Sequence, residues 1–501
     1  MMRSLYSAVS GLRTHQSKMD VLGNNIANVN TVAFKSSSVT FNDVLYQTVS
    51  NASGTNTVTG TGGVNAKQIG LGVTTAATKI AITTEGATQT TGDSLDLKIS
   101  GQNFFVVSNG QSNLFTRDGS FYIDGTGNLC MSSTGYNVMG WQLATDATTQ
   151  SGYVEPRVIQ QDTVSKLTPM SANNMVSPPA ATENASLSGI IDNNTSALNN
   201  GGYVMTLNFY DTLGFSYTAK FSMSDPDTTT VAGKTYFSMK LTDILNSEGE
   251  SILGATAANT IFPDVWAQYN ASTGVFEEIC TRTITGGTGT AADPYTYAFN
   301  QAAAQYRVVD DNGKTTGVKL NIATTDGDNS LPLDNLTAIN ADSNFRNISI
   351  DMTTSYNYDN DGTSTLSMTR GDTDGSNAGY PVGSMTGLTI DSTGCIYGTY
   401  NNGTTLLLCQ IATAAFANAS GLESLGNNCY ATTLNSGEFD GIGQDISANA
   451  GTITSGVLEM SNVDLSAEFT NMITTQRGFQ ANSRVITTSD SLLEELINLK
   501  R

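Results

Sequence analysis

Residues 465–497 read LSAEFTNMITTQRGFQANSRVITTSDSLLEELI, and apolar side chains recur in this segment in alternating steps of three and four residues. This spacing places an apolar stripe along one side of an α-helix, where the stripe can pack against a second helix. Residues 2–26, MRSLYSAVSGLRTHQSKMDVLGNNI, carry the same spacing. The sequence therefore predicts a helix within residues 1–30 and another within 464–501, which together form a coiled-coil-like inner domain.

The predicted helix contact is built from large apolar residues with a few polar interruptions. The apolar positions are Leu5, Val9, Leu12, Met19, Leu22, Ile26, Leu465, Phe469, Met472, Phe479, Ile486, Leu493 and Ile497. The polar positions, which we call the polar seam, are Gln16, Gln476, Ser483 and Asp490. Polar residues in a helix contact lower its stability and specify register or partner number, so we expect an adjustable contact. Alternatively, these four side chains are exposed because each helix packs on one side only.

Both predicted helices are expected to depend on neighbouring molecules. Ordering one backbone residue costs about 1–2 kcal/mol, and a helix gains most of its stability from packing of its apolar face. We therefore expect the two ends to be largely disordered in the free subunit and to become helical when neighbours cover them.

The composition favours β structure between the ends and excludes several functional classes. Only 13% of the 501 residues are charged and 49 are glycine, which is typical of many short strands with polar turns. The net charge of −21 excludes a nucleic-acid partner, because phosphate binding requires a basic face. Since no segment approaches the roughly twenty apolar residues of a membrane span, no membrane insertion is expected. The N-terminus also lacks the apolar core of a cleaved signal peptide.

Proline use and strand-like segments predict a multidomain protein with mainly β outer domains. All nine prolines lie between Pro156 and Pro381. Short segments rich in aromatic and β-branched residues occur before and after this region, and we expect them to complete one domain around an insertion. The predicted division is 76–148 with 382–435 for an inner β domain, 149–381 for one or two inserted outer β domains, and 31–75 with 436–463 for bridging linkers.

No group of residues in the sequence predicts an active site or a cofactor. His15 is the single histidine and is expected at a polar helix position. Asn357, Asp359 and Asp361 match the opening of a calcium loop, but Met368 stands where the bidentate glutamate should be. A weak calcium site near Asp359 remains an alternative to simple turns. The five scattered cysteines predict free thiols rather than disulfides or zinc ligands. We therefore predict no enzyme activity, no cofactor and no metal.

Motifs at both ends resemble the rod, hook and hook-associated family of bacterial flagellar axial proteins. The matching segments are SAVSGL (7–12), MDVLGNNIAN (19–28), FK (34–35), GVLEMSNVDL (456–465) and TQRGFQANSR (475–484). The most specific positions in these family motifs are Asn24, Asn25, Asn28, Asn462 and Asp464. Within the family, residues 410–422 and the chain length resemble hook proteins. The opening MMRSLY (1–6) is closer to distal rod proteins, which remain an alternative.

The resemblance implies a structural subunit that polymerises into the hook. The hook is a short, curved, flexible tube that acts as a universal joint and transmits torque from rod to filament. The resemblance also implies an extracellular location in the flagellum, reached through the flagellar export apparatus without a cleaved signal peptide. Expected partners are copies of the chain itself, rod and hook–filament junction proteins, and the hook cap.

A rival interpretation from a different class is a secreted, β-rich surface adhesin. This function would account for the Thr/Asn/Gly-rich strands but not for a helix at each end. Deleting both ends separates the two interpretations, because an adhesin would still bind its target.

Overall fold

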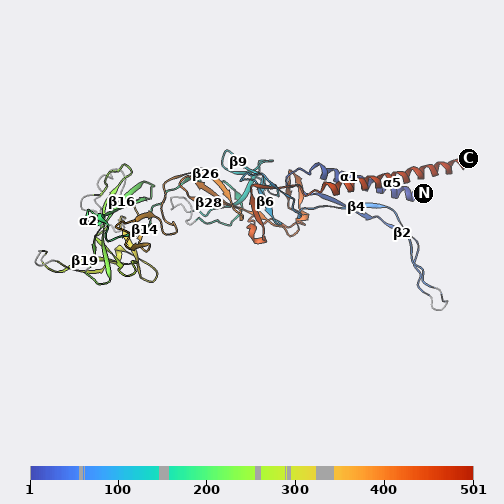
Figure 1. Cartoon of the computed structure of the whole chain (residues 1–501). Helices are drawn as coiled ribbons and strands as arrows, with labels where there is room; N and C mark the ends of the chain where they lie inside the picture. The colour runs from blue at the N-terminus through green and yellow to red at the C-terminus, as the bar shows by residue number, and fades with distance from the viewer. Residues whose placement is uncertain are drawn as a thin grey trace. The chain divides into compact units, whose positions relative to one another are not determined.

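The computed structural model describes residues 2–55, 60, 62–145, 157–228, 230–253, 261–287, 289, 295–322 and 344–499. As the sequence predicts, these residues form mainly β-strands, with a long helix at each end of the chain (Figure 1). The chain divides into two compact units. Unit 1 comprises Met1–Met175, Met385–Thr399 and Thr405–Arg501, and unit 2 comprises Val176–Ser384 and Tyr400–Thr404. The boundary expected at residues 148–149 lies outside the described residues.

The ends of the chain form two antiparallel helices, α1 (Met2–Ala27) and α5 (Leu465–Asn498), which both belong to unit 1. Asp464 is the N-cap of α5, because its carboxylate accepts hydrogen bonds from two backbone N–H groups of the first turn. Gly11 of α1 lies against Asn482 of α5, which fixes the register of the pair.

A two-stranded ribbon, residues 37–80, follows α1. Its strands are β1 (Ser37–Asp43), β2 (Tyr46–Ser50), β3 (Lys67–Gly70) and β4 (Val73–Ile80); β1 pairs with β4, and β2 with β3 (Figure 1). Phe41 packs edge-on against His15 of α1, with 5.7 Å between ring centroids. The sequence predicts an extended linker over 31–75. Most of its described residues form the ribbon, because Thr, Val and Tyr recur in the four strands and favour strand pairing.

Most of a 13-stranded sheet lies in unit 1. Its strands are β7 (Phe104–Ser108), β8 (Asn113–Thr116), β9 (Phe121–Ile123), β10 (Leu129–Met131), β11 (Asn137–Gln142), β12 (Ser165–Lys166), β13 (Val176–Ser177), β26 (Gly383–Ile390), β27 (Cys395–Tyr400), β28 (Thr405–Ile411), β29 (Thr413–Ala414), β30 (Glu423–Gly426) and β31 (Cys429–Ala431). Pairing of β11 with β28 and of β8 with β31 joins the early and late strand blocks. Phe105, Val107 and Ile411 are fully buried in the core of this sheet.

Residues 436–463 contain regular structure where the sequence predicts a linker. The elements are a 3-10 turn, η3 (Ile446–Asn449), and two strands, β32 (Thr452–Ser455) paired with β6 (Leu97–Ser100) and β33 (Val457–Glu459) paired with β5 (Thr88–Thr90). Ile453 packs in the same core cluster as Leu97 and Ile99. Two short alternating strands in a Gly/Ser-rich segment give a weak sequence pattern, and their partners lie several hundred residues earlier.

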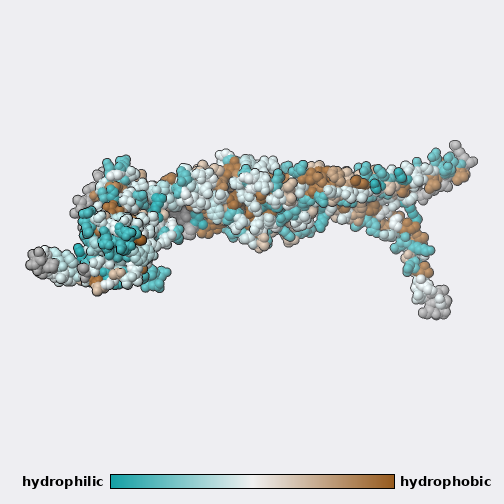
Figure 2. Space-filling model, viewed as in Figure 1, coloured by the Kyte–Doolittle hydropathy of each residue, from teal (hydrophilic) through white to brown (hydrophobic). Residues whose placement is uncertain are grey.

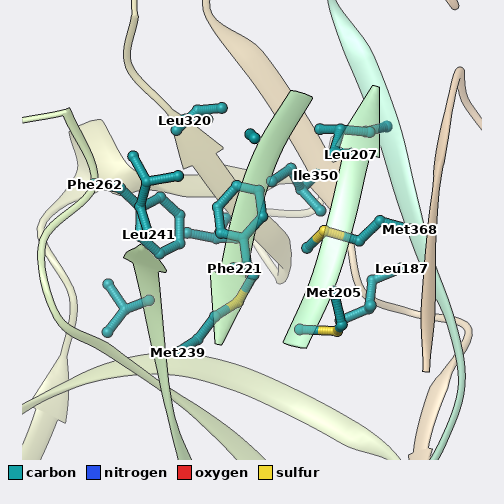
Figure 3. Packing of buried hydrophobic residues seen from close by; sticks show 14 of the residues in the cluster. Leu187, Met205, Leu207, Phe221, Met239, Leu241, Phe262, Leu320, Ile350 and Met368 are labelled. Atoms are coloured by element: carbon teal, nitrogen blue, oxygen red, sulfur yellow. The ribbon is translucent and has the colours of Figure 1, made fainter. Parts of the chain in front are cut away.

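Unit 2 contains two six-stranded sheets with a shared core. The first is a meander of β15 (Tyr203–Tyr210), β16 (Ser216–Asp227), β17 (Lys234–Leu245), β18 (Val265–Asn270), β19 (Phe276–Gly286) and β20 (Thr296–Gln301). The second contains β14 (Asn184–Ile191), β21 (Arg307–Val309), β22 (Thr315–Leu320), β23 (Ile348–Asp351), β24 (Ser355–Asn357) and β25 (Ser367–Arg370). Leu207 and Phe221 of the first sheet pack with Leu187, Leu320 and Ile350 of the second (Figure 3). The two sheets therefore enclose one hydrophobic cluster.

Candidate assembly surface and polar junction

Small and polar residues lie where α1 and α5 approach closely: Gly11 faces Asn482, and Gly478 faces His15. The buried residues of α1 include Ala8, Gly11, Thr14, Leu22 and Asn25, and those of α5 are Thr475 and Ser489. A Cβ atom on Gly11 would lie 2.7 Å from the side-chain nitrogen of Asn482, and one on Gly478 would lie 2.8 Å from Cε1 of His15. Both distances are too short for non-bonded atoms. The helices therefore approach closely because glycine stands at these positions.

This contact differs from the one that the sequence predicts. Of the predicted apolar residues, Leu22 is buried; Leu5, Leu12, Met19, Ile26, Met472, Phe479, Ile486 and Leu493 are partly buried; and Val9, Leu465, Phe469 and Ile497 are exposed. The four polar-seam residues Gln16, Gln476, Ser483 and Asp490 are all exposed. In the single chain they do not line the helix contact, as the one-sided alternative expects. The buried stripe lies beside the predicted one because glycine and alanine permit closer packing than large apolar residues do.

Large apolar side chains consequently remain on the outer surface of unit 1 (Figure 2). On the helices they include Val9, Phe469, Ile473, Val485, Leu492 and Ile497. On the ribbon they are Val44, Leu45, Tyr46, Val49, Val64 and Ile69. Exposed apolar residues that recur along neighbouring elements are typical of a surface that another protein covers. These two groups of residues form the candidate assembly surface.

Asparagines of the family motifs connect the helix pair to the ribbon. Asn25 forms two hydrogen bonds with the backbone of Ser37: it donates to the carbonyl oxygen at 2.8 Å and accepts from the N–H group at 3.0 Å. Its amide also donates to Glu468 of α5 at 3.2 Å. Asn28 donates to Asn24 and accepts from Thr31, which closes the end of α1. One buried amide thus fixes α1, α5 and the start of β1.

Asn462 makes the corresponding connection before α5. Its side-chain oxygen accepts a hydrogen bond from the N–H group of Ser36 at 2.7 Å, and its amide donates to the carbonyl oxygens of Ala81 and Thr84 at 2.9 and 3.1 Å. Three backbone groups, from the segments just before and just after the ribbon, therefore meet at one side chain. Together with Asn25, this residue defines what we call the polar junction.

Replacing Asn462 with alanine should lower the free energy of unfolding of unit 1 by about 2 kcal/mol, because three backbone groups lose their partner. Urea unfolding measures this value. The matched control is Asn42→Ala, at an exposed ribbon position, for which we expect a change below about 0.5 kcal/mol. Equal effects of the two substitutions would contradict the role of the junction.

A buried ion cluster lies next to the polar junction. Glu459, the last residue of β33, is fully buried. Its carboxylate accepts hydrogen bonds from Lys35 Nζ at 2.7 Å and from the N–H group of Gly86 at 2.8 Å. Arg117 Nη1 lies 3.6 Å from the other carboxylate oxygen, and the guanidinium donates to the backbone oxygen atoms of Ile99 and Gly101. Burial lowers the pKa of Lys35 and of Arg117, and the negative charge of Glu459 partly offsets this effect. The carboxylate therefore stabilises two buried cations.

Family comparisons agree with the motifs at both ends. The model "Flagella basal body rod protein" matches residues 5–35, "Flagellar hook protein FlgE/F/G D1 domain" matches 98–167, and "Flagellar basal body rod FlgEFG protein C-terminal" matches 454–499. The chain is 33% identical to the flagellar hook protein FlgE of Borreliella burgdorferi over 516 residues, which cover 100% of both chains. The chain belongs to the flagellar hook protein family. The corresponding protein of Treponema pallidum is also 33% identical, over 515 residues and with the same coverage.

Family membership assigns the chain to the structural proteins of the bacterial flagellar hook, and hence to motility. The rod alternative is also represented among the relatives: the flagellar basal-body rod protein FlgG of Bacillus subtilis is 27% identical over 501 residues, with 100% of each chain covered. No pattern in the sequence predicts the ion cluster of Lys35, Arg117 and Glu459. Lys35 and Glu459 lie within the family motifs FK (34–35) and GVLEMSNVDL (456–465). Their place in these motifs is the feature of the sequence that could have indicated the cluster.

The described residues contain no group of three or more His, Cys, Asp or Glu side chains arranged to hold a metal ion. Met368, at the position that a calcium loop would fill with glutamate, packs in the core of unit 2 (Figure 3). In the described part of the chain, no helix is long and apolar enough to cross a membrane.

The five cysteines are free thiols, four of them buried. Burial raises the pKa of each thiol, to about 11 for Cys429 and about 12 for Cys280. Because the thiolate is the reactive form, native protein at pH 8 should resist alkylation by iodoacetamide, whereas all five should react in guanidinium. Mass spectrometry of the alkylated protein checks this, and rapid labelling of any native cysteine would contradict it.

Proposed function

We propose that the chain polymerises into a short, curved, flexible tube that transmits torque from rod to filament as a universal joint. The observation that supports this most directly is the pair of terminal helices, whose mutual contact uses small residues and leaves large apolar side chains outside. A surface of this kind is unfavourable in a free molecule and favourable in an assembly. Family membership supplies the type of assembly.

In this proposal residues 1–30 and 464–501 form the inner wall of the tube, where they extend into coiled-coil-like contacts with neighbouring copies. Residues 31–75 and 436–463 bridge between subunits, 76–148 with 382–435 form the inner β domain, and 149–381 forms the outer part. The subunits leave the cell through the flagellar export apparatus without a cleaved signal peptide and assemble outside it. Rod proteins, hook–filament junction proteins and the hook cap are the further partners.

Electron microscopy of the purified chain tests the proposal. Concentrated protein should form tubes with a regular subunit repeat, and deletion of residues 2–27 or 465–498 should abolish them. Straight, rigid tubes would favour the rod alternative, for which the B. subtilis relative is the specific support. If the full-length chain stays monomeric at every concentration while a form lacking both ends binds a surface target, the adhesin interpretation replaces this one.

The polar-seam residues should contribute to bending. As the curved tube rotates, each row of subunits must shorten and lengthen once per turn, and exposed polar side chains allow helices of neighbouring copies to slide. Replacing Gln476, Ser483 and Asp490 with leucine should therefore straighten or stiffen the tube, which electron microscopy measures as curvature. The control carries leucine at the exposed positions Thr474, Ala481 and Thr488 of the same helix. Unchanged curvature in the first variant, or equal straightening in both, would contradict a role for the polar seam.

A further inference from the structure

The C-terminal end of α5 extends beyond its partner helix. The register in which Gly11 lies against Asn482 places the start of α1 opposite Ser491, so residues 492–498 have no α1 residue beside them (Figure 1). At this end of the chain Leu492 is 55% exposed, Ile497 68% and Leu499 80%. We call residues 492–499 the α5 tail. Its large apolar side chains are uncovered in the single chain.

The tail also carries two carboxylates, on Glu494 and Glu495. Leu492, Glu495 and Leu499 are separated by steps of three and four residues, so they lie on one side of the helix. Neither glutamate forms an ion pair within the described part of the chain. This side of the tail therefore presents an acidic group between two leucines.

A groove with the complementary character lies on the same unit, between α1 and the base of the ribbon. Its volume is about 500 Å³, and its lining includes Tyr6, Val9 and Arg13 of α1 with Val44 and Val73 of the ribbon. Tyr6, Val9 and Val44 are between 43% and 65% exposed. The guanidinium of Arg13 forms no ion pair among the described residues. The rest of the lining is Ser10, Thr14, Ser17, Thr74 and Thr75. The groove therefore presents a cation among apolar and hydroxyl side chains.

The tail cannot reach the groove of its own chain. In the antiparallel register Arg13 lies opposite Gln480. Leu492 is a further twelve residues along the helix, which corresponds to about 18 Å at 1.5 Å per residue. A tail that fills the groove must therefore come from another molecule.

We propose that this groove binds the α5 tail of a second copy of the chain, with Arg13 paired to Glu494 or Glu495 and the leucines packed on Tyr6, Val9 and Val44. The inference rests on the proposed polymerisation and names the contact that produces it. Groove and tail are different surfaces, so the contact is head-to-tail and can continue from copy to copy. Opposite charges at its centre fix the orientation of the arriving helix.

Charge reversal tests the pairing. We expect Arg13→Glu, and separately Glu494→Arg with Glu495→Arg, each to raise the critical concentration for tube formation at least ~10-fold, equivalent to about 1.4 kcal/mol. Combining the reversed charges in one chain should bring it back to within ~3-fold of the original. Arg3→Glu makes the same charge change on α1 outside the groove lining and should leave the critical concentration unchanged.

Cross-linking tests the geometry independently. Val9→Cys protein is mixed with Leu492→Cys or Leu499→Cys protein, assembled and oxidised. Each chain carries one added thiol, so a dimer band in one of the mixtures, absent from each variant alone, supports the proposed contact. Circular dichroism of each variant verifies that it folds.

The outcomes separate the groove from the proposed function. If the unaltered chain forms tubes, but charge reversal has no effect and neither mixture cross-links, the groove assignment is overturned and polymerisation stands. If Arg3→Glu weakens assembly as much as Arg13→Glu, the effect comes from the charge of α1 in general, which also overturns it. If the unaltered chain forms no tubes, both proposals fail.

Discussion

Replacing Glu459 with alanine should lower the free energy of unfolding of unit 1 by about 3–5 kcal/mol, because it leaves two buried cations without a counter-charge. Lys35 and Arg117 have side chains only 1% exposed, so water cannot take over the role of the carboxylate. The N–H group of Gly86 loses its acceptor in addition. Urea unfolding followed by the fluorescence of Trp141, in a Trp266→Phe background, reports on unit 1 alone.

An exposed ion pair provides the matched control for this effect. Lys240 Nζ lies 3.1 Å from Asp264, and the two side chains are 44% and 51% exposed. Asp264→Ala should change the free energy of unfolding of unit 2 by about 0–1 kcal/mol, since water screens both charges. If Glu459→Ala lowers the free energy of unfolding by no more than Asp264→Ala does, the cluster does not hold the segments before and after the ribbon together.

Replacing Gly478 with leucine should separate α1 from α5 and abolish tube formation. A Cβ atom there would already lie 2.8 Å from Cε1 of His15, and leucine adds three further carbon atoms in the same direction. Overpacking of this kind costs about 1–3 kcal/mol, and the small polar contact has few other interactions to compensate. The measurement is the critical concentration for assembly, determined by sedimentation. We expect it to rise beyond the accessible range.

Two further variants separate close packing from a general intolerance of α1 and α5 to substitution. Gly23 has no atom within 4 Å of an added Cβ, so Gly23→Ala should stabilise α1 by about 0.5–1 kcal/mol and preserve the tubes. His15→Ala combined with Gly478→Leu removes the clashing ring and should restore part of the assembly. Normal tubes from Gly478→Leu alone would show that the close approach of the helices is dispensable.

The spacing of apolar residues was sufficient to predict the terminal helices but not the faces by which they meet. Three-four spacing identified the two segments that form α1 and α5. Hydropathy then favoured Val9 and Phe469, while the helices approach each other closely at Gly11 and Gly478. Small residues contribute little to a hydropathy pattern. Their importance is steric, and it becomes visible only when the partner helix is in place.

The polar junction and the ion cluster lay further beyond what the sequence could show. Lys35 and Glu459 are separated by 424 residues, and each is a charged residue of the kind that ordinarily lies on the surface. They become buried when the chain, after leaving unit 2, re-enters unit 1 and β33 pairs with β5. Long-range pairing of this kind leaves no periodicity in either segment. Resemblance to known motifs marked the positions, and the structure supplied the physical reason.

Hydrogen exchange of residues 2–27 and 465–498, compared between dilute monomer and assembled tube, tests the central claim most directly. We predict that backbone amides of both helices exchange rapidly in the monomer and become strongly protected in the tube, because large apolar side chains such as Phe469 and Ile497 are covered only by neighbouring copies. Equal and strong protection of both helices in the monomer would show that they need no neighbours and would contradict the account.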